Sequence, residues 1–234
     1  MHGALARAPF SMFPGGQDCC EGAFDFNEYT VIASPRLDKA LGCEIWFNRD
    51  LPIIFHTSKR RDCETYIRKY TVLVSEPRVL IVTFSTRVGL FAVFNLHAPD
   101  QSCGAEYVNN YWDSIDTYVK TTLPSNCPFY VCGDTNAHLG YNGSCQYIGF
   151  FGAEKVNLPG QRFSRFIRQN GLWLPGTFSE ISDCPVHNTK TFFHANGGSY
   201  RSDYIALPAS HMSHPCFYRV LSDSPISREP FVDH

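Results

Sequence analysis

An apolar segment runs directly into a glycine, a carboxylate and a carboxamide in the sequence Phe129-Tyr130-Val131-Cys132-Gly133-Asp134-Thr135-Asn136. A short apolar run that follows the turn residues 124–126 is typical of a strand buried on both faces. Asp134 and Asn136 are two residues apart, so they would project to the same side if the chain stays extended. The segment therefore predicts a buried strand that brings polar side chains to one edge of a sheet.

A carboxylate and a carboxamide at a strand end have two interpretations. The carboxylate of Asp134 could take a proton from an attacking water or bind a divalent cation, and the amide of Asn136 could donate to a phosphate oxygen without adding negative charge. Alternatively, both residues cap a turn, because Gly-Asp-x-Asn is ordinary turn chemistry. The segment alone leaves both interpretations open.

Further apolar runs predict strands before and after this one. Residues 79–84 and 90–96 are almost continuously apolar and are joined by a short polar turn, as in strands covered on both faces. The other predicted strands are residues 29–33, 44–47, 189–193, 204–207 and 216–221.

Two segments have the periodicity of amphipathic helices. Residues 107–123 carry apolar side chains three and four positions apart with acidic residues between them. Residues 163–172 place Phe163, Phe166 and Ile167 on one side and arginines on the other, and end at Gly171. The order of strands, helix, strand, helix and strands predicts a mixed α/β sandwich.

The composition is compatible with one folded domain. The chain has 234 residues, of which 44% are hydrophobic and 15% aromatic, enough to bury a large core. Residues 1–22 lack a period and are expected to be a poorly ordered lead-in, with residues 23–234 forming the domain. The net charge of -2 excludes the broad positive field that grips duplex DNA, so any nucleic-acid contact must be local.

The ten cysteines contain no C-x-x-C spacing, which argues against a structural zinc site. Residues 1–20 contain no apolar run of signal-peptide length after a basic start. No stretch approaches the roughly 20 apolar residues of a membrane helix. We therefore expect an intracellular protein with mostly reduced cysteines and no membrane span.

A histidine follows a second buried strand in the sequence Asn95-Leu96-His97-Ala98-Pro99. Pro99 fixes where the strand stops, so His97 can lie at the same edge of the sheet as Asp134. There the imidazole could donate to a phosphate oxygen or protonate a leaving alkoxide. The alternative is a structural histidine, which is the usual role of a lone histidine at a strand end.

Two further clusters carry carboxylates and an imidazole. Asp203 stands at the entrance of the strand predicted at 204–207, and the sequence closes on Asp233 and His234. If Asp203 lies beside His234, it would orient that ring and hold its proton, which leaves Asp233 free to bind metal. Alternatively, Asp203 caps a turn and residues 232–234 are a frayed tail.

Taken together and in this order, the clusters resemble the motifs of the endonuclease/exonuclease/phosphatase superfamily. The family's G-D-[FLT]-N, N/S-x-H-x-P, R-[IL]-D-[YH]-[IVF] and S-D-H motifs are similar to residues 133–136, 95–99, 201–205 and 232–234. Each motif alone is weak, whereas four in the right order are specific. Over about residues 29–234 the spacing is similar to that of deoxyribonuclease-like members, and the endonuclease domains of non-LTR retrotransposons are the most similar in character.

The resemblance implies an α/β fold that is a four-layer sandwich of two stacked mixed β-sheets flanked by helices, with Mg²⁺ or Mn²⁺ in the cleft. It implies that Asp233, Asp134 and Asn136 hold the metal ion. Asp134 would also activate the water, and Asn136 and His97 would hold the phosphate and stabilise its added charge.

The same resemblance assigns roles to the later motifs. His234, paired with Asp203, would bind or polarise the phosphate, and Arg201 would add local phosphate affinity. The chain departs from the family pattern because the strand closed by Gln-Glu, whose glutamate is a metal ligand, has no clear counterpart. Only Asp18 or Glu21 could replace that glutamate, so the domain looks truncated at both ends.

The function implied by the resemblance is metal-dependent hydrolysis of phosphodiester bonds, by an endonuclease with nucleic acid as its partner and DNA as its substrate. The alternatives are a phosphomonoesterase or phospholipase of the same superfamily, and a catalytically impaired remnant that lacks its N-terminal metal ligands.

Overall fold

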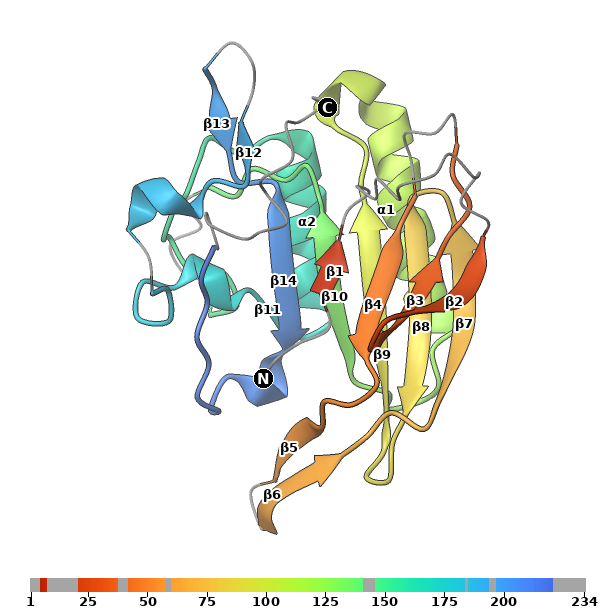
Figure 1. Ribbon diagram of the computed structural model, residues 1–234. Helices are drawn as coiled ribbons and strands as arrows, with labels where there is room; N and C mark the ends of the chain where they lie inside the picture. The colour runs from red at the N-terminus through yellow and green to blue at the C-terminus, as the bar shows by residue number, and fades with distance from the viewer. Residues whose placement is uncertain are drawn as a thin grey trace.

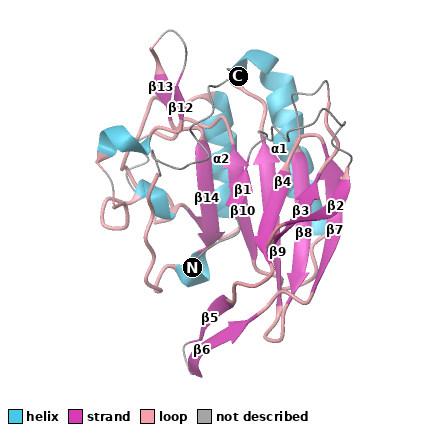
Figure 2. Ribbon diagram, in the orientation of Figure 1, coloured by secondary structure: helices cyan, strands magenta, loops and turns pink. Residues whose placement is uncertain are grey.

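The computed structural model describes residues 5–7, 21–37, 42–57, 60–140, 146–183, 185–193 and 197–220. Two β-sheets are stacked face to face, and two α-helices cover the outer face of the larger sheet (Figures 1 and 2). The predicted α/β fold with two stacked sheets is therefore confirmed. The described residues include no α-helix over the outer face of the smaller sheet.

The larger sheet has six strands. Its order is β11 (Leu172–Trp173), β14 (Asp203–Pro208), β10 (Phe129–Asp134), β9 (Leu90–His97), β8 (Val79–Ser85) and β7 (Lys69–Glu76). β9 and β10 are parallel, whereas all the other neighbouring pairs are antiparallel, so the sheet is mixed.

The smaller sheet has four strands that are all antiparallel, so the prediction of two mixed sheets is correct only for the larger one. The strand order of the smaller sheet is β1 (Leu5–Arg7), β4 (Glu44–Asn48), β3 (Tyr29–Ala33) and β2 (Gly22–Phe26). β1 and β2 were not predicted, and β1 comes from the segment that we expected to be a poorly ordered lead-in. Two hairpins stand apart from both sheets, β5 (Ile53–Thr57) with β6 (Arg60–Thr65), and β12 (Phe192–Phe193) with β13 (Ser199–Tyr200).

Two apolar layers hold the sheets and helices together. Between the sheets, Ile45 and Ile32 pack with side chains of the larger sheet such as Phe91 and Val93. On the other face of the larger sheet, Phe94 packs against the helices, as do Ala92 and Leu96, two positions away on either side in β9. Because both faces of β8, β9 and β10 are covered, these strands are almost continuously apolar in sequence.

The two helices confirm the amphipathic pattern. α1 (Ala105–Thr121) buries Val108, Trp112 and Ile115 against the sheet. α2 (Leu158–Gln169) begins earlier than predicted, because the Asn157 side chain accepts a hydrogen bond from the Gly160 N–H and caps the first turn. No helix among the described residues has the length and apolar character needed to span a membrane.

Two predicted strands differ from the structure. Residues 186–189 form a 3₁₀ turn before the short strand β12, so the predicted strand at 189–193 is largely absent. Residues 216–220 form no strand and contribute only an isolated bridge between Ser182 and Tyr218, while residue 221 lies outside the described residues. Among the described cysteines, the free ones are Cys43, Cys103, Cys127, Cys132 and Cys216.

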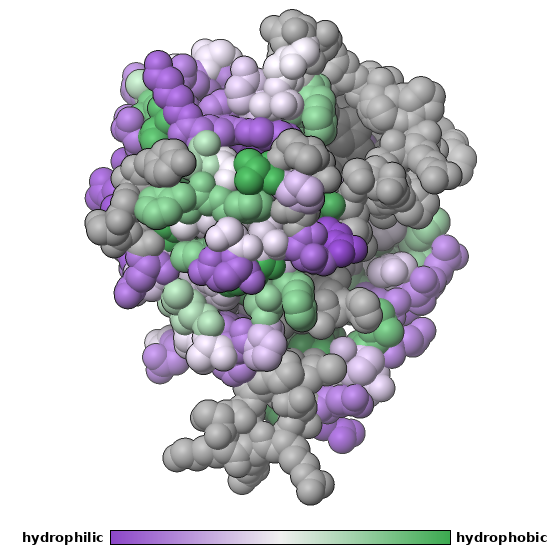
Figure 3. Space-filling model, turned by 90° about the vertical axis from the view of Figure 1, so that its left-hand side faces the viewer, coloured by the Kyte–Doolittle hydropathy of each residue, from purple (hydrophilic) through white to green (hydrophobic). Residues whose placement is uncertain are grey.

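One side of the molecule, seen in Figure 3, mixes hydrophobic and hydrophilic side chains. The coloured hydrophobic residues form small groups that hydrophilic residues separate. Scattered apolar side chains are normal on protein surfaces, so this side gives no indication of a large apolar docking patch.

A pair of substitutions in β9 tests the packing between the sheet and the helices. Phe94→Ala removes a fully buried ring from the core beneath α1 and α2, and we expect the free energy of unfolding to fall by about 3–5 kcal/mol. Leu90→Ala, in the same strand but 38% exposed, should cost less than about 1 kcal/mol. Urea denaturation measures both values. Equal losses would contradict the packing described here.

Candidate active site

Three of the predicted site residues lie side by side across neighbouring strands. Asp134, the last residue of β10, is in register with His97 on β9 and with Asp203 on β14. Residues in register on adjacent strands share a face of the sheet, and neighbouring strands are about 4.8 Å apart. The alternation of buried neighbours places all three on the face turned away from the helices. We call this set the carboxylate row.

The glycine before Asp134 is required by the close approach of β10 to β9. Gly133 has φ of 130°, which side-chain-bearing residues rarely adopt. A Cβ atom at this position would lie 2.1 Å from the carbonyl oxygen of Leu96 and 2.8 Å from Oδ1 of Asn95. Only glycine therefore lets Asp134 sit beside His97 in this register.

The chain turns immediately after Asp134, so the expectation that Asn136 continues an extended strand is wrong. Asn136 has φ of 48°, and its N–H donates to Oδ1 of Asp134 at 2.8 Å. Its side-chain Nδ2 donates to the carbonyl oxygen of Ala98 at 2.8 Å. Asn136 thus caps the turn, as the alternative interpretation held, and ties the end of β10 to the loop that follows β9.

Asp203 is held in place by residues that the sequence analysis did not single out as site residues. The N–H groups of Ser202 and Asp203 both donate to Oγ1 of Thr191, at 3.2 and 3.1 Å. The Ser202 hydroxyl donates to Oδ2 of Asp203 at 3.2 Å, and the Ser202 carbonyl accepts from both the N–H and the hydroxyl of Thr135. Thr191 lies in the segment at 189–193, which resembles the family's threonine-containing strand before the R-x-D motif. That resemblance could have identified Thr191 as a residue that supports the site.

The electrostatics of the carboxylate row favour a cation. Burial, followed by the charge of Asp203, raises the pKa of Asp134 to about 7, and the Asn136 N–H, the Ser202 hydroxyl and Arg78 only partly oppose this shift. Two carboxylates on adjacent strands in a partly desolvated place repel each other. A divalent cation between them would remove that repulsion.

The carboxylates present fit Mg²⁺ or Mn²⁺ in part. Mg²⁺ commonly takes one or two carboxylates and completes its shell with waters and substrate phosphates. Within the part of the chain that the structure describes, no group of three His, Cys, Asp or Glu residues is placed to hold a metal ion. Asp134 and Asp203 are therefore two candidate ligands, and the carbonyl oxygen of the Asn136 side chain is a third.

The other predicted metal ligands are not at this edge or cannot be placed. Asp233 and His234 lie outside the described residues, as does Asp18. Glu21 accepts a hydrogen bond from the Ser75 hydroxyl on β7 at 3.0 Å, and β7 is separated from β10 by β8 and β9. Glu21 is therefore not a substitute for the family's glutamate.

Arg201 does not face the site, so its expected contact with phosphate is wrong. The side chain is 1% exposed, and its guanidinium lies 4.9 Å from the ring centres of both Tyr204 and Tyr218. Nη1 donates to the carbonyl oxygen of Gly176 at 2.8 Å. Arg201 therefore joins β14 to two loops and is a structural residue.

A partly buried glutamate, Glu154, connects the segments that carry the site. Glu154 accepts hydrogen bonds from the Lys190 ammonium and from the Arg201 N–H, and its own N–H donates to the Leu139 carbonyl oxygen at 2.7 Å. Its second carboxylate oxygen lies 3.8 Å from Nδ1 of His138. One carboxylate thus links the loop after Asn136 to the residues before Asp203.

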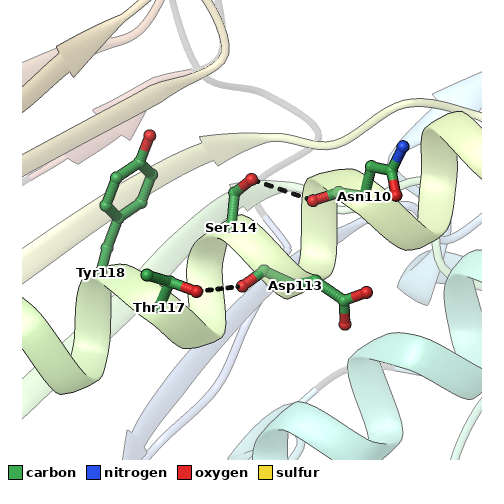
Figure 4. A pocket seen from close by; sticks show the side chains of 5 residues that line it. All are labelled: Asn110, Asp113, Ser114, Thr117 and Tyr118. Carbon is green, nitrogen blue, oxygen red and sulfur yellow. Dashed lines mark hydrogen bonds between the residues drawn. The ribbon is translucent and has the colours of Figure 1, made fainter.

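A hollow on α1 is unrelated to the carboxylate row. It is lined by Asn110, Asp113, Ser114, Thr117 and Tyr118 (Figure 4). Ser114 and Thr117 donate to backbone carbonyls one turn earlier, and Asp113 pairs with Arg162 of α2. Because α1 covers the opposite face of the sheet, these residues belong to the helix surface.

The motifs and the architecture now agree. The G-D-x-N, N-x-H-x-P and R-x-D segments meet at one edge of a larger sheet that is stacked on a smaller one. This arrangement resembles the endonuclease/exonuclease/phosphatase fold that the motifs imply. In that fold the meeting edge is where the resemblance places the metal and the phosphate.

Similar solved structures include proteins of this kind. The endonuclease domain of TRAS1, a telomere-specific non-LTR retrotransposon, is 14% identical with a TM-score of 0.48, over 79% of this chain and 69% of that chain. The 3′ phosphatase NExo from Neisseria, bound to a product DNA hairpin, is 13% identical with a TM-score of 0.48, over 79% and 68%. An endonuclease/exonuclease/phosphatase family protein from Bacteroides thetaiotaomicron is 18% identical with a TM-score of 0.45, over 79% and 62%. No protein-family model and no curated protein matches the sequence.

The raised pKa of Asp134 predicts how stability depends on pH without metal. The folded protein keeps this proton up to about pH 7, whereas the unfolded chain loses it near 3.8, so stability falls as the pH rises between these values. Asp134→Asn removes this penalty, and we expect it to be more stable than the wild type at pH 8 by roughly 1–4 kcal/mol. The difference should vanish below about pH 4. Thermal unfolding in a chelating buffer measures both curves.

Asp50→Asn is the matched control, because Asp50 is exposed in the turn after β4. Its unfolding curve should follow that of the wild type at every pH. If Asp134→Asn does the same, the carboxylate row does not carry the electrostatic strain described here.

Proposed function

We propose that this chain is a metal-dependent phosphodiesterase that acts as an endonuclease on DNA. The observation that carries the proposal is the register that aligns His97, Asp134 and Asp203 on one face of the sheet. Two carboxylates and an imidazole in a row supply the groups that phosphodiester hydrolysis requires.

Asp134 and Asp203 would hold Mg²⁺ or Mn²⁺, with the Asn136 side-chain oxygen as a third ligand. When bound, the ion would neutralise negative charge on the phosphate and polarise the phosphate oxygens. Asp233 completes the ligand set in this proposal, and His234, oriented by Asp203, contacts the phosphate.

The remaining steps belong to side chains of the described residues. Asp134 stands at the end of β10 beside His97 and can take a proton from water. His97 lies on the adjacent strand and can donate to a phosphate oxygen. Nδ2 of Asn136 donates one proton to the Ala98 carbonyl, which fixes the amide and leaves its second proton for the phosphate.

Two parts of the proposal, that the substrate is DNA and that the cut is internal, rest on the motifs that resemble those of retrotransposon endonucleases. The chain departs from that pattern at the glutamate ligand, so a low rate is compatible with the proposal. Mutating a residue that only supports a metal ligand already costs typically 10–100-fold in metal affinity or activity.

Nicking of a supercoiled plasmid tests the proposal. With Mn²⁺ or Mg²⁺, the wild type should convert supercoiled DNA to the open circle, and a chelator should abolish the reaction. His97→Ala, Asp134→Asn and Asp203→Asn should each lower the rate by roughly 100-fold or more. Asp50→Asn, at the exposed turn after β4, should nick at the rate of the wild type. Equal nicking by all variants would refute the proposal.

The same preparations distinguish the alternatives. Release of phosphate from a monoester, or hydrolysis of a phospholipid, without plasmid nicking would assign the site to the phosphatase or phospholipase branch. Absence of every activity, together with no binding of Mn²⁺ by the wild type, would identify a remnant.

A further inference from the structure

The end of the molecule opposite the carboxylate row is rich in basic residues. β9 and β10 end at the edge that carries His97 and Asp134, whereas the β5–β6 hairpin projects from the other end (Figure 1). In the sequence, residues 60–69 and 85–89 hold two acidic residues and five of the chain's 20 basic ones, which are Arg60, Arg61, Arg68, Lys69 and Arg87. These two segments are locally positive although the chain carries a net charge of -2.

Backbone contacts bring three of these residues together. The Arg68 N–H donates to the carbonyl oxygen of Ser85 at 2.9 Å, and Lys69 is in register with Ser85. The Arg87 N–H donates to Oγ1 of Thr65, the last residue of β6, at 3.2 Å. The start of β7, the end of β8 and the end of β6 therefore meet, and the side chains of Arg68, Lys69 and Arg87 are all exposed.

These three cations differ from many other basic residues of the protein. Arg36, Arg49, Arg162, Lys190 and Arg219 each pair with a carboxylate. Among the described residues, no ion pair involves Arg68, Lys69 or Arg87. Three exposed charges that acidic side chains do not neutralise remain available to an external polyanion.

We propose that Arg68, Lys69 and Arg87 form a second nucleic-acid-binding surface that contacts backbone phosphates away from the carboxylate row. This surface goes beyond the proposed catalytic site and rests on the proposed function only for the choice of nucleic acid as the polyanion. It supplies the local phosphate affinity that the buried Arg201 and the paired Lys190 do not provide.

Binding without turnover tests the surface. The probe is a fluorescein-labelled 40-base-pair duplex in a chelating buffer, followed by anisotropy over a series of salt concentrations. The triple variant Arg68→Ala/Lys69→Ala/Arg87→Ala should weaken binding by about tenfold or more at 0.1 M salt, and the slope of log K against log salt should fall by roughly 2–3. A single-stranded DNA and an RNA duplex identify the form of nucleic acid preferred.

The matched control is Lys120→Ala/Arg165→Ala/Arg168→Ala, which removes the same charge from exposed positions of α1 and α2. This control should keep the affinity within about twofold and the slope unchanged. Equal losses in both triple variants, or no loss in either, would overturn the proposal. So would a loss of binding to vesicles containing phosphatidylserine while duplex binding is retained.

The catalytic proposal is tested separately by plasmid nicking, in which Asp134→Asn should lose activity. If no preparation nicks DNA but the basic triple variant still loses affinity, the binding surface stands and the proposed function fails. If the wild type nicks DNA but the triple variant binds the duplex normally, the proposed function stands and the binding surface fails.

Discussion

The hydrogen-bond register between β9, β10 and β14 is the constraint on which the candidate site depends. It aligns His97, Asp134 and Asp203 on one face, and a slip of one residue in β10 would turn Asp134 towards the helices. The register is fixed by apolar packing on both faces of β9 and by Gly133, which alone fits against the Leu96 carbonyl. The site is therefore a consequence of how the core packs.

The same register carries an energetic cost. Asp134 and Asp203 are adjacent and partly desolvated, which raises the pKa of Asp134 and destabilises the metal-free protein above neutral pH. Strongly shifted carboxyl groups of this kind cluster at functional sites. Thr191 and Glu154 hold the surrounding segments, so the two carboxylates cannot move apart without breaking several hydrogen bonds. The protein is thus built to keep two like charges together.

The sequence predicted the strands best where the chain is apolar on both faces, as at 79–84 and 90–96, because burial alone determines that pattern. It also identified the Gly133–Asn136 segment. It gave the turn at Asn136 only as one of two interpretations, because the local hydrogen bond from the Asn136 N–H to Asp134 is joined by a second one from its side chain to Ala98, 38 residues earlier in the chain. Likewise, Arg201 is buried by a ring of Tyr218 and the Gly176 carbonyl, and nothing local to the R-x-D motif indicates those contacts.

Metal binding by the carboxylate row tests the account most directly. Calorimetric titration of Mn²⁺ into the wild type at pH 7.5 should show one site, and Asp203→Asn should weaken its affinity by about tenfold or more. Equal affinity in the two proteins, or no binding by the wild type, would contradict the claim that these two adjacent carboxylates form a cation site.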